Sequence, residues 1–109
     1  MSSPAVVISV DPKTGDITYA PSVLHVSRRD RVTWKTARND PFTVVFPQTP
    51  FADGTVSLRS SGPPLKSPAF AEDAAGVYHY MVAISVEIRE GGPSEIFLDA
   101  GCPDIIVGK

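Results

Sequence analysis

The stretch of sequence that decides the fold is YAPSVLHVSRRDRVTWKT, residues 19–36. In its first half, Leu24 and Val26 alternate with residues of the opposite face. In its second half, Val32 and Trp34 share one face, and charged or polar residues occupy the other. Alternation with a period of two is typical of strands with one buried face. The triplet RRD between the halves has the composition of a turn. We therefore predict two short strands joined by a polar turn.

The rest of the chain repeats this pattern of short segments and turns. No segment shows a sustained helical period of apolar residues, and eleven prolines and eight glycines disfavour long helices. The segments expected to form strands are 5–10, 17–20, 22–27, 31–36, 42–46, 55–60, 76–86, 95–100 and 104–108. About seven to nine short strands without helices indicate an all-β fold, a Greek-key β-sandwich or barrel.

The chain is expected to form a single domain, residues 1–109, because this length suits one hydrophobic core. Residues 47–70 are the least regular part and contain five prolines. A loop of this length is expected either to fold back on the core or to be used for binding. The strong turn EGGPS at 90–94 predicts an extra hairpin over about residues 83–99.

Three motifs occur in order between residues 17 and 82. The first is an aromatic residue, a proline, alternating apolar residues, an aspartate and V-x-W, matched by Tyr19, Pro21, Leu24, Val26, Asp30, Val32 and Trp34. The second is P-H-T-V or H-N-V-V-F after a short polar loop, which reads Pro41, Phe42, Thr43 and Val44 here, so that Phe42 stands in place of the histidine. The third runs from an aromatic residue through glycine to Y-x-Y, matched by Phe70, Gly76, Tyr78 and Tyr80. This series resembles the cupredoxins, the blue-copper protein superfamily, although Arg29 replaces their usual glycine. The resemblance implies a cupredoxin-like fold.

The resemblance does not extend to the copper ligands of that family, which are two histidines, a cysteine and a methionine. Phe42 stands at the first histidine position and Val82 at the cysteine position. The following segment, AISVEIREGG, contains neither histidine nor methionine. We therefore expect a metal-free domain without a cofactor, in which the hairpin at 83–99 replaces the ligand loop.

An immunoglobulin-like sandwich is the alternative topology. The segment AEDAAGVYHY, residues 71–80, resembles the tyrosine corner of that fold. However, Tyr80 stands where that motif has cysteine, and no cysteine precedes Trp34. The disulfide-centred core of that fold is therefore not expected.

A non-standard metal site is the alternative function. In a strand over 77–86, His79 and Met81 lie on the same face, and they could bind copper or another metal together with His25 or Cys102. The simpler interpretation is that His79 and Met81 cover the outer side of a sheet. We favour that interpretation.

Composition and motifs disfavour several other functions. Both histidines lie in predicted strands and no nucleophile elbow or paired carboxylate motif occurs, so an enzyme is not expected. A net charge of −2 gives no attraction to nucleic acid, and no apolar run is long enough to span a membrane. With one cysteine and no basic leader, we expect a cytoplasmic protein, or a periplasmic one if a leader was removed.

The leading hypothesis is a non-enzymatic module that binds a protein partner of unidentified kind. Phe42, Phe46, Phe51 and Phe70 frame the irregular loop. Either an apolar patch formed by these residues docks the partner, or the loop folds over and buries it. We predict the docking patch. The 83–99 hairpin offers an edge at which a second copy could pair to form a homodimer.

Overall fold

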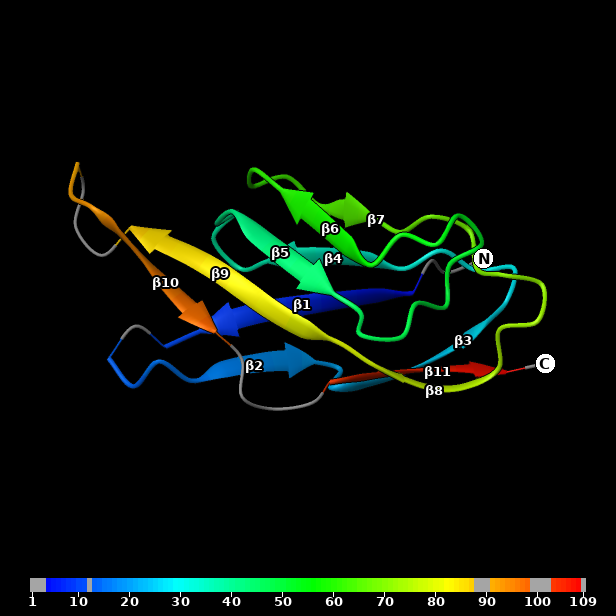
Figure 1. Ribbon diagram of the computed structural model, residues 1–109. Coiled ribbons are helices and arrows are strands. Elements are labelled where there is room, and N and C mark those ends of the chain that lie inside the picture. The colour runs from blue at the N-terminus through cyan, green and yellow to red at the C-terminus, as the bar shows by residue number, and fades with distance from the viewer. Residues whose placement is uncertain (1–3, 12, 88–90, 99–102, 109) are drawn as a thin grey trace.

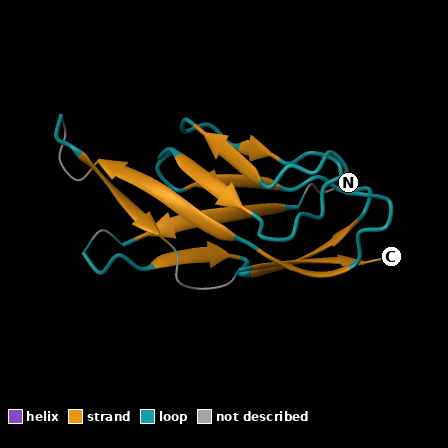
Figure 2. Ribbon diagram, viewed as in Figure 1, coloured by secondary structure: helices purple, strands orange, loops and turns teal. Residues whose placement is uncertain are grey.

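The computed structural model describes residues 4–11, 13–87, 91–98 and 103–108, and every regular element in them is a strand (Figure 1, Figure 2). The strands are β1 (Ala5–Val10), β2 (Ile17–Ala20), β3 (Val23–Ser27), β4 (Thr33–Thr36), β5 (Phe42–Val45), β6 (Ser57–Ser60), β7 (Leu65–Lys66), β8 (Gly76–His79), β9 (Met81–Glu87), β10 (Ser94–Leu98) and β11 (Asp104–Gly108). The predicted all-β class is confirmed. None of these elements is a helix that could cross a membrane.

The strands form three sheets. Their orders are β2-β1-β4-β7, β10-β9-β5-β6 and β3-β11-β8. The pairs β1–β4 and β3–β11 are parallel, and the other pairs are antiparallel. The two four-stranded sheets overlap along the long axis, and the three-stranded sheet lies toward the end that carries the C-terminus (Figure 1). Each strand belongs to one sheet, and the chain passes repeatedly from one sheet to another.

The segment predicted as one strand over 76–86 is divided at Tyr80. Residues before the division, in β8, pair with β11, whereas residues after it, in β9, pair with β5 and β10. The amide of Tyr80 donates to the Pro103 carbonyl at 3.1 Å, outside both ladders. One segment thus serves two sheets, which accounts for one of the strands beyond the number expected.

The core lies between the two four-stranded sheets and follows the predicted alternation. Alternate residues of β9 are buried, and the same holds for β5, β4 and β1. The largest fully buried side chains of these strands include Trp34, Ile8, Ile84, Val6, Val44, Val82 and Val86. The predicted core face of the 77–86 segment is therefore confirmed, with Tyr78 half-buried at its start.

The irregular segment 47–70 folds back on the core, one of the two outcomes expected for it. It contains β6 as predicted and the short strand β7, which the sequence did not indicate. The Ser67 hydroxyl accepts a hydrogen bond from the Val32 amide at 3.0 Å, and the Ser67 amide donates to the Val32 carbonyl at 2.7 Å. These bonds fix the returning segment against the strand that carries Trp34.

The predicted hairpin at 83–99 corresponds to β9 and β10, which pair antiparallel. Residues 88–90, between these two strands, lie outside the described residues. On the inner face, a Cβ placed on Gly15 would lie 3.5 Å from the Phe97 ring, so the β1–β2 turn covers this part of β10. The outer face of β10 is not covered in this way: its Ile96 and Leu98 are 70% and 73% exposed.

Candidate functional site

The four phenylalanines predicted to form a docking patch are all buried. Phe42, Phe46, Phe51 and Phe70 have at most 5% of their surface exposed. The Phe46 and Phe51 rings meet edge to face at 5.1 Å, and the Phe51 and Phe70 rings stack at 5.5 Å. The prediction of an exposed patch is corrected: β5 directs its alternate residues inward, and the loop places its own aromatic rings over them. These four side chains belong to the hydrophobic core and do not form an exposed patch.

The candidate metal donors do not form a cluster in the described residues. His79 is 65% exposed and its Nδ1 is hydrogen-bonded to Asp104 Oδ1, the pair that β8 and β11 place in register. His25 is exposed on β3, and Met81 is exposed on β9, in a different sheet from His79. Cys102 lies outside the described residues.

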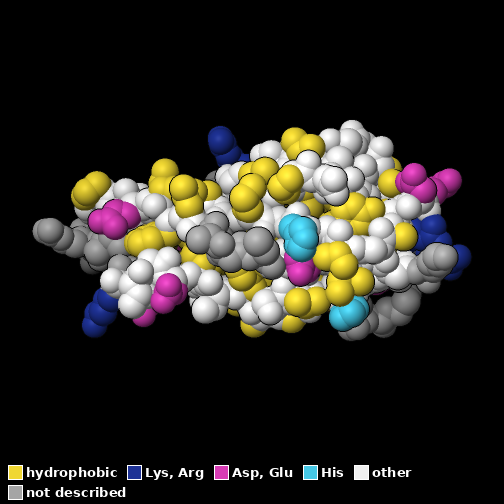
Figure 3. Space-filling model, turned by 60° about the horizontal axis from the view of Figure 1, so that its bottom comes forward, with side chains coloured by type: hydrophobic (Ala, Val, Ile, Leu, Met, Phe, Trp, Pro, Cys, Tyr) yellow, Lys and Arg dark blue, Asp and Glu magenta, His cyan; other side chains and the backbone are white. Residues whose placement is uncertain are grey.

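Within the part of the chain that the structure describes, no three His, Cys, Asp or Glu side chains approach one another closely enough to hold a metal ion. The two histidines stand apart on the surface (Figure 3). The change of sheet at Tyr80 explains why neighbouring positions in the sequence do not give one site. The fold turns His79 toward Asp104, whereas Met81 belongs to the outer face of β9.

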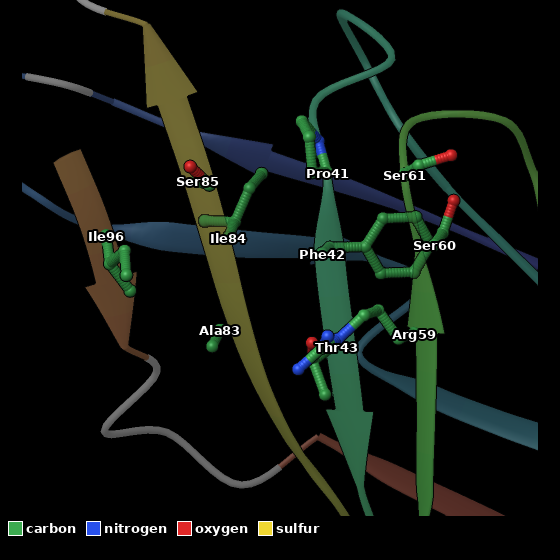
Figure 4. Close-up of a pocket in the computed structure, with 10 residues that line it drawn as sticks. All are labelled: Pro41, Phe42, Thr43, Arg59, Ser60, Ser61, Ala83, Ile84, Ser85 and Ile96. Carbon is green, nitrogen blue, oxygen red and sulfur yellow. The ribbon is translucent and has the colours of Figure 1, made fainter. Parts of the chain in front are cut away.

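The outer face of the β10-β9-β5-β6 sheet holds a groove of about 350 Å³ (Figure 4). We call it the outer groove. The groove is lined by Pro41, Phe42, Thr43, Arg59, Ser60, Ser61, Ala83, Ile84, Ser85 and Ile96. Register explains its form: the small residues of β9 and β5 lie in the middle of the sheet, between the longer side chains of β6 and β10. The centre of the sheet is therefore hollow, and its margins are raised.

The chemistry of the outer groove is apolar with one cationic margin. Arg59 reaches across β5 toward Thr43 (Figure 4). Arg59 is the charged residue among the described lining residues, and it makes no ion pair with another described residue. Ile96 bounds the opposite margin, and Leu98 continues the apolar surface along β10.

The outer groove was not identified from the sequence, although the signal was present. In SEIFL, residues 94–98, Ile96 and Leu98 alternate with Glu95 and Phe97, so both faces of this strand carry a large apolar residue. A strand with apolar residues on both faces is either buried on both sides or exposes one of them. The sequence does not tell these cases apart.

Comparison with known proteins identifies the fold. No protein-family model matches the sequence, and no curated protein matches it significantly. Among solved structures, a purple cupredoxin from Nitrosopumilus maritimus aligns with 97% of this chain and 100% of its own, at 16% identity and a TM-score of 0.51. A point mutant of amicyanin in its reduced Cu(I) form covers 99% of this chain and 86% of its own, at 22% identity and a TM-score of 0.47.

This chain has a cupredoxin-like fold. At such low identity the likeness concerns the fold alone, since one fold can carry unrelated functions. The predicted cupredoxin-like class is confirmed.

The residues at the expected copper positions of this cupredoxin-like fold do not suit a copper ion. The sequence pattern places Phe42 at the first histidine position and Val82 at the cysteine position. These two lie on the neighbouring strands β5 and β9, two register steps apart, and both are 2% exposed. A phenyl ring and an isopropyl group supply no lone pair, whereas copper needs imidazole and thiolate ligands.

Proposed function

We propose that this chain is a non-enzymatic, metal-free, cupredoxin-like module that binds a protein partner at the outer groove. The observation that carries the proposal is the apolar surface of Ile96 and Leu98 beside a hollow on the same sheet face. Exposed apolar patches next to a groove mark interaction sites more often than isolated apolar residues do.

The chemistry of the groove favours a particular kind of partner segment. Its apolar floor suits an aliphatic or aromatic side chain, which gains about 25 cal/mol for each Å² of apolar surface removed from water. Its rim carries the Arg59 guanidinium and the Ser61 and Ser85 hydroxyl groups. An apolar centre with a polar rim is the usual anatomy of a protein interface. We therefore propose a partner that inserts an apolar side chain and presents a carboxylate to Arg59.

The surroundings of His79 support the non-enzymatic part of the proposal. The His79–Asp104 pair has the form of a base with an orienting carboxylate. The hollow beside His79 is lined, in the described residues, by Pro47, Gln48 and Val77. None of these three carries a hydroxyl or thiol nucleophile.

One observation favours the alternative function, metal handling through His25, His79, Met81 and Cys102. A carboxylate bound to one ring nitrogen of a histidine orients the other nitrogen and raises its basicity toward a metal. The His79–Asp104 contact has that arrangement. A single oriented imidazole without a second converging donor is a weak site, so partner binding remains the first proposal.

Two matched variants test the proposal by affinity capture from cells that express the chain. Ala83→Arg fills the outer groove from a half-buried position in the middle of β9. Val77→Arg places the same side chain on the three-stranded sheet, at a residue that is already half exposed. We expect the same partner to be captured by the unmodified chain and by Val77→Arg, and to be lost with Ala83→Arg. Equal capture by both variants would show that the outer groove is not the docking site.

A further inference from the structure

Among the described strands, β10 forms one edge of the β10-β9-β5-β6 sheet, and its neighbour there is β9. Backbone groups along such an edge are a template for another strand. The hydrogen bonding between β9 and β5 shows which backbone groups of β10 point to the free side.

The register determines the direction of each backbone group in β10. The Ser85 amide donates to the Pro41 carbonyl at 2.9 Å, so Ser85 is bonded toward β5. In an antiparallel ladder, successive residues point alternately to the two neighbouring strands. Ile84 and Val86 are therefore bonded toward β10.

The residues of β10 opposite Ile84 and Val86 are Phe97 and Glu95. Their backbone groups are engaged with β9, by the same alternation. The N–H and C=O groups of Ser94, Ile96 and Leu98 consequently point to the free edge.

The side chains of this edge carry a single protecting charge, on Glu95. Natural edge strands are protected by charged side chains, lysine above all, by proline or by a bulge. The sequence of β10, SEIFL, contains neither lysine nor proline, and its pairing with β9 is continuous. Its one charged residue, Glu95, has its backbone bonded toward β9. The free side therefore combines backbone groups that pair with no other described strand with the highly exposed side chains of Ile96 and Leu98.

We propose that β10 pairs antiparallel with β10 of a second copy of this chain, about a two-fold axis at Ile96. In this register Ile96 faces Ile96 of the second copy, and Ser94 faces Leu98. All three residues with outward backbone groups then form hydrogen-bonded pairs, giving six bonds at two for each pair. A register centred on Glu95 or Phe97 leaves two such pairs within β10, and thus four bonds.

Charge favours the same register. Centring the axis on Glu95 would place two carboxylates directly opposite each other, which destabilises a strand pair. With the axis at Ile96, Glu95 instead faces Phe97 of the second copy. The β10-β9-β5-β6 sheet of one copy then joins the same sheet of the second copy. The outer face of the joined sheet carries Ile96 and Leu98 from both copies.

The expected association is weak. Pairing of two five-residue strands buries less than the ~1,000 Å² that a stable specific interface usually needs. We therefore expect a dimer that forms in the micromolar to millimolar range. The inference does not rest on the proposed partner-binding function, because it uses edge backbone groups and leaves the outer groove open.

Sedimentation equilibrium of the full chain, from about 10 µM to about 1 mM, tests the proposal together with two variants of one residue. Ile96→Pro removes the central N–H group of the edge. The monomer should tolerate this change, because that N–H points to solvent and proline is found on edge strands. Ile96→Thr keeps the N–H group and shortens the apolar side chain. We expect dimerisation of the unmodified chain, a dissociation constant within about fivefold for Ile96→Thr, and weakening by more than about tenfold for Ile96→Pro.

Amide hydrogen exchange of the unmodified chain gives a second test that needs no variant. The amides of Ser94, Ile96 and Leu98 should gain protection as concentration rises. The amides of Glu95 and Phe97 should keep the same protection at all concentrations, because they are bonded to β9.

Four results would overturn the proposal. The first is a monomer throughout the concentration range. The second is equal dimerisation of the unmodified chain and Ile96→Pro. The third is equal weakening by both variants, which would assign the contact to side chains. The fourth is protection of the edge amides only after addition of a different protein, which would make that protein the occupant. If Ile96→Pro fails to fold, the amide exchange pattern of the unmodified chain decides whether β10 pairs with a second copy.

Discussion

Replacement of Phe42 by serine is the change that most directly tests the placement of the phenylalanines. If Phe42 formed an exposed patch, Phe42→Ser would leave the fold intact. In the structure Phe42 is 2% exposed and lies on β5 between Ile84 of β9 and Ser60 of β6. We therefore expect a large loss of stability.

The magnitude follows from burial. Removing a buried phenyl ring costs about 3–5 kcal/mol, from lost transfer free energy and the cavity left behind. A serine hydroxyl without a partner at this position adds about 1 kcal/mol or more. A domain of this size is stable by only about 5–15 kcal/mol, so the change removes a large share of the total. At about 4 °C for each kcal/mol, we expect the Tm to fall by about 15 °C or more.

Thermal and urea unfolding, followed by circular dichroism, measure this effect. The matched control is Ile96→Ser, which makes a comparable apolar-to-serine change at a residue that is 70% exposed. The control should change the free energy of unfolding by less than about 1 kcal/mol. A loss below about 1 kcal/mol for Phe42→Ser, with an unchanged urea m-value, would refute the placement of this ring in the core.

Three further predictions concern the backbone, an exposed carboxylate and metal binding. Gly62 has φ = 142°, and a Cβ added there would lie 2.6 Å from the Asn39 carbonyl oxygen. At Gly54 nothing lies within 4 Å of an added Cβ, so Gly62→Ala should destabilise the fold more than Gly54→Ala. Equal urea midpoints of the two variants would contradict this. The Thr55 amide donates a hydrogen bond to the Asp53 carboxylate at 2.9 Å and lowers the pKa of Asp53. The stability contributed by this hydrogen bond should be present above the ordinary pKa of aspartate and be lost as the pH falls through the folded-state pKa. Acid unfolding curves of Asp53→Asn should therefore lose part of their pH dependence in that window, and identical curves would refute the assignment. Elemental analysis, with thermal unfolding in equimolar Cu(I), Cu(II) or Zn(II), should show no bound ion and no rise in Tm, whereas one stoichiometric ion with a clear rise would support metal handling.

The candidate site shows where prediction from the sequence stopped. The hairpin of β9 and β10 could be predicted because a glycine–proline turn separates two alternating segments. The sequence could not predict whether the apolar residues of β10 face another layer, because this depends on which distant segment packs against them. In the structure the β1–β2 turn covers Phe97, and the opposite face carries the outer groove.

His79 and Met81 do not form one metal site in the described residues, and the sequence could not show this for a similar reason. Period-two alternation correctly placed His79 and Met81 on the outer side of their segment. It could not indicate that the segment changes sheets at Tyr80, because β8 and β9 follow each other without a turn residue between them. The pairing of His79 with Asp104 depends on β11, about 25 residues further along the chain.

The sequence by itself determined the class of fold and the inward face of most strands. These follow from local rules, since each strand alternates its side chains and each proline or glycine limits the backbone around it. The tertiary structure alone decided which outward faces of the described strands remain open, that the loop phenylalanines belong to the core, and that β10 lies at an edge of its sheet among the described strands. Those properties depend on contacts between segments far apart in the chain, and the alternation of one strand carries no information about its neighbours.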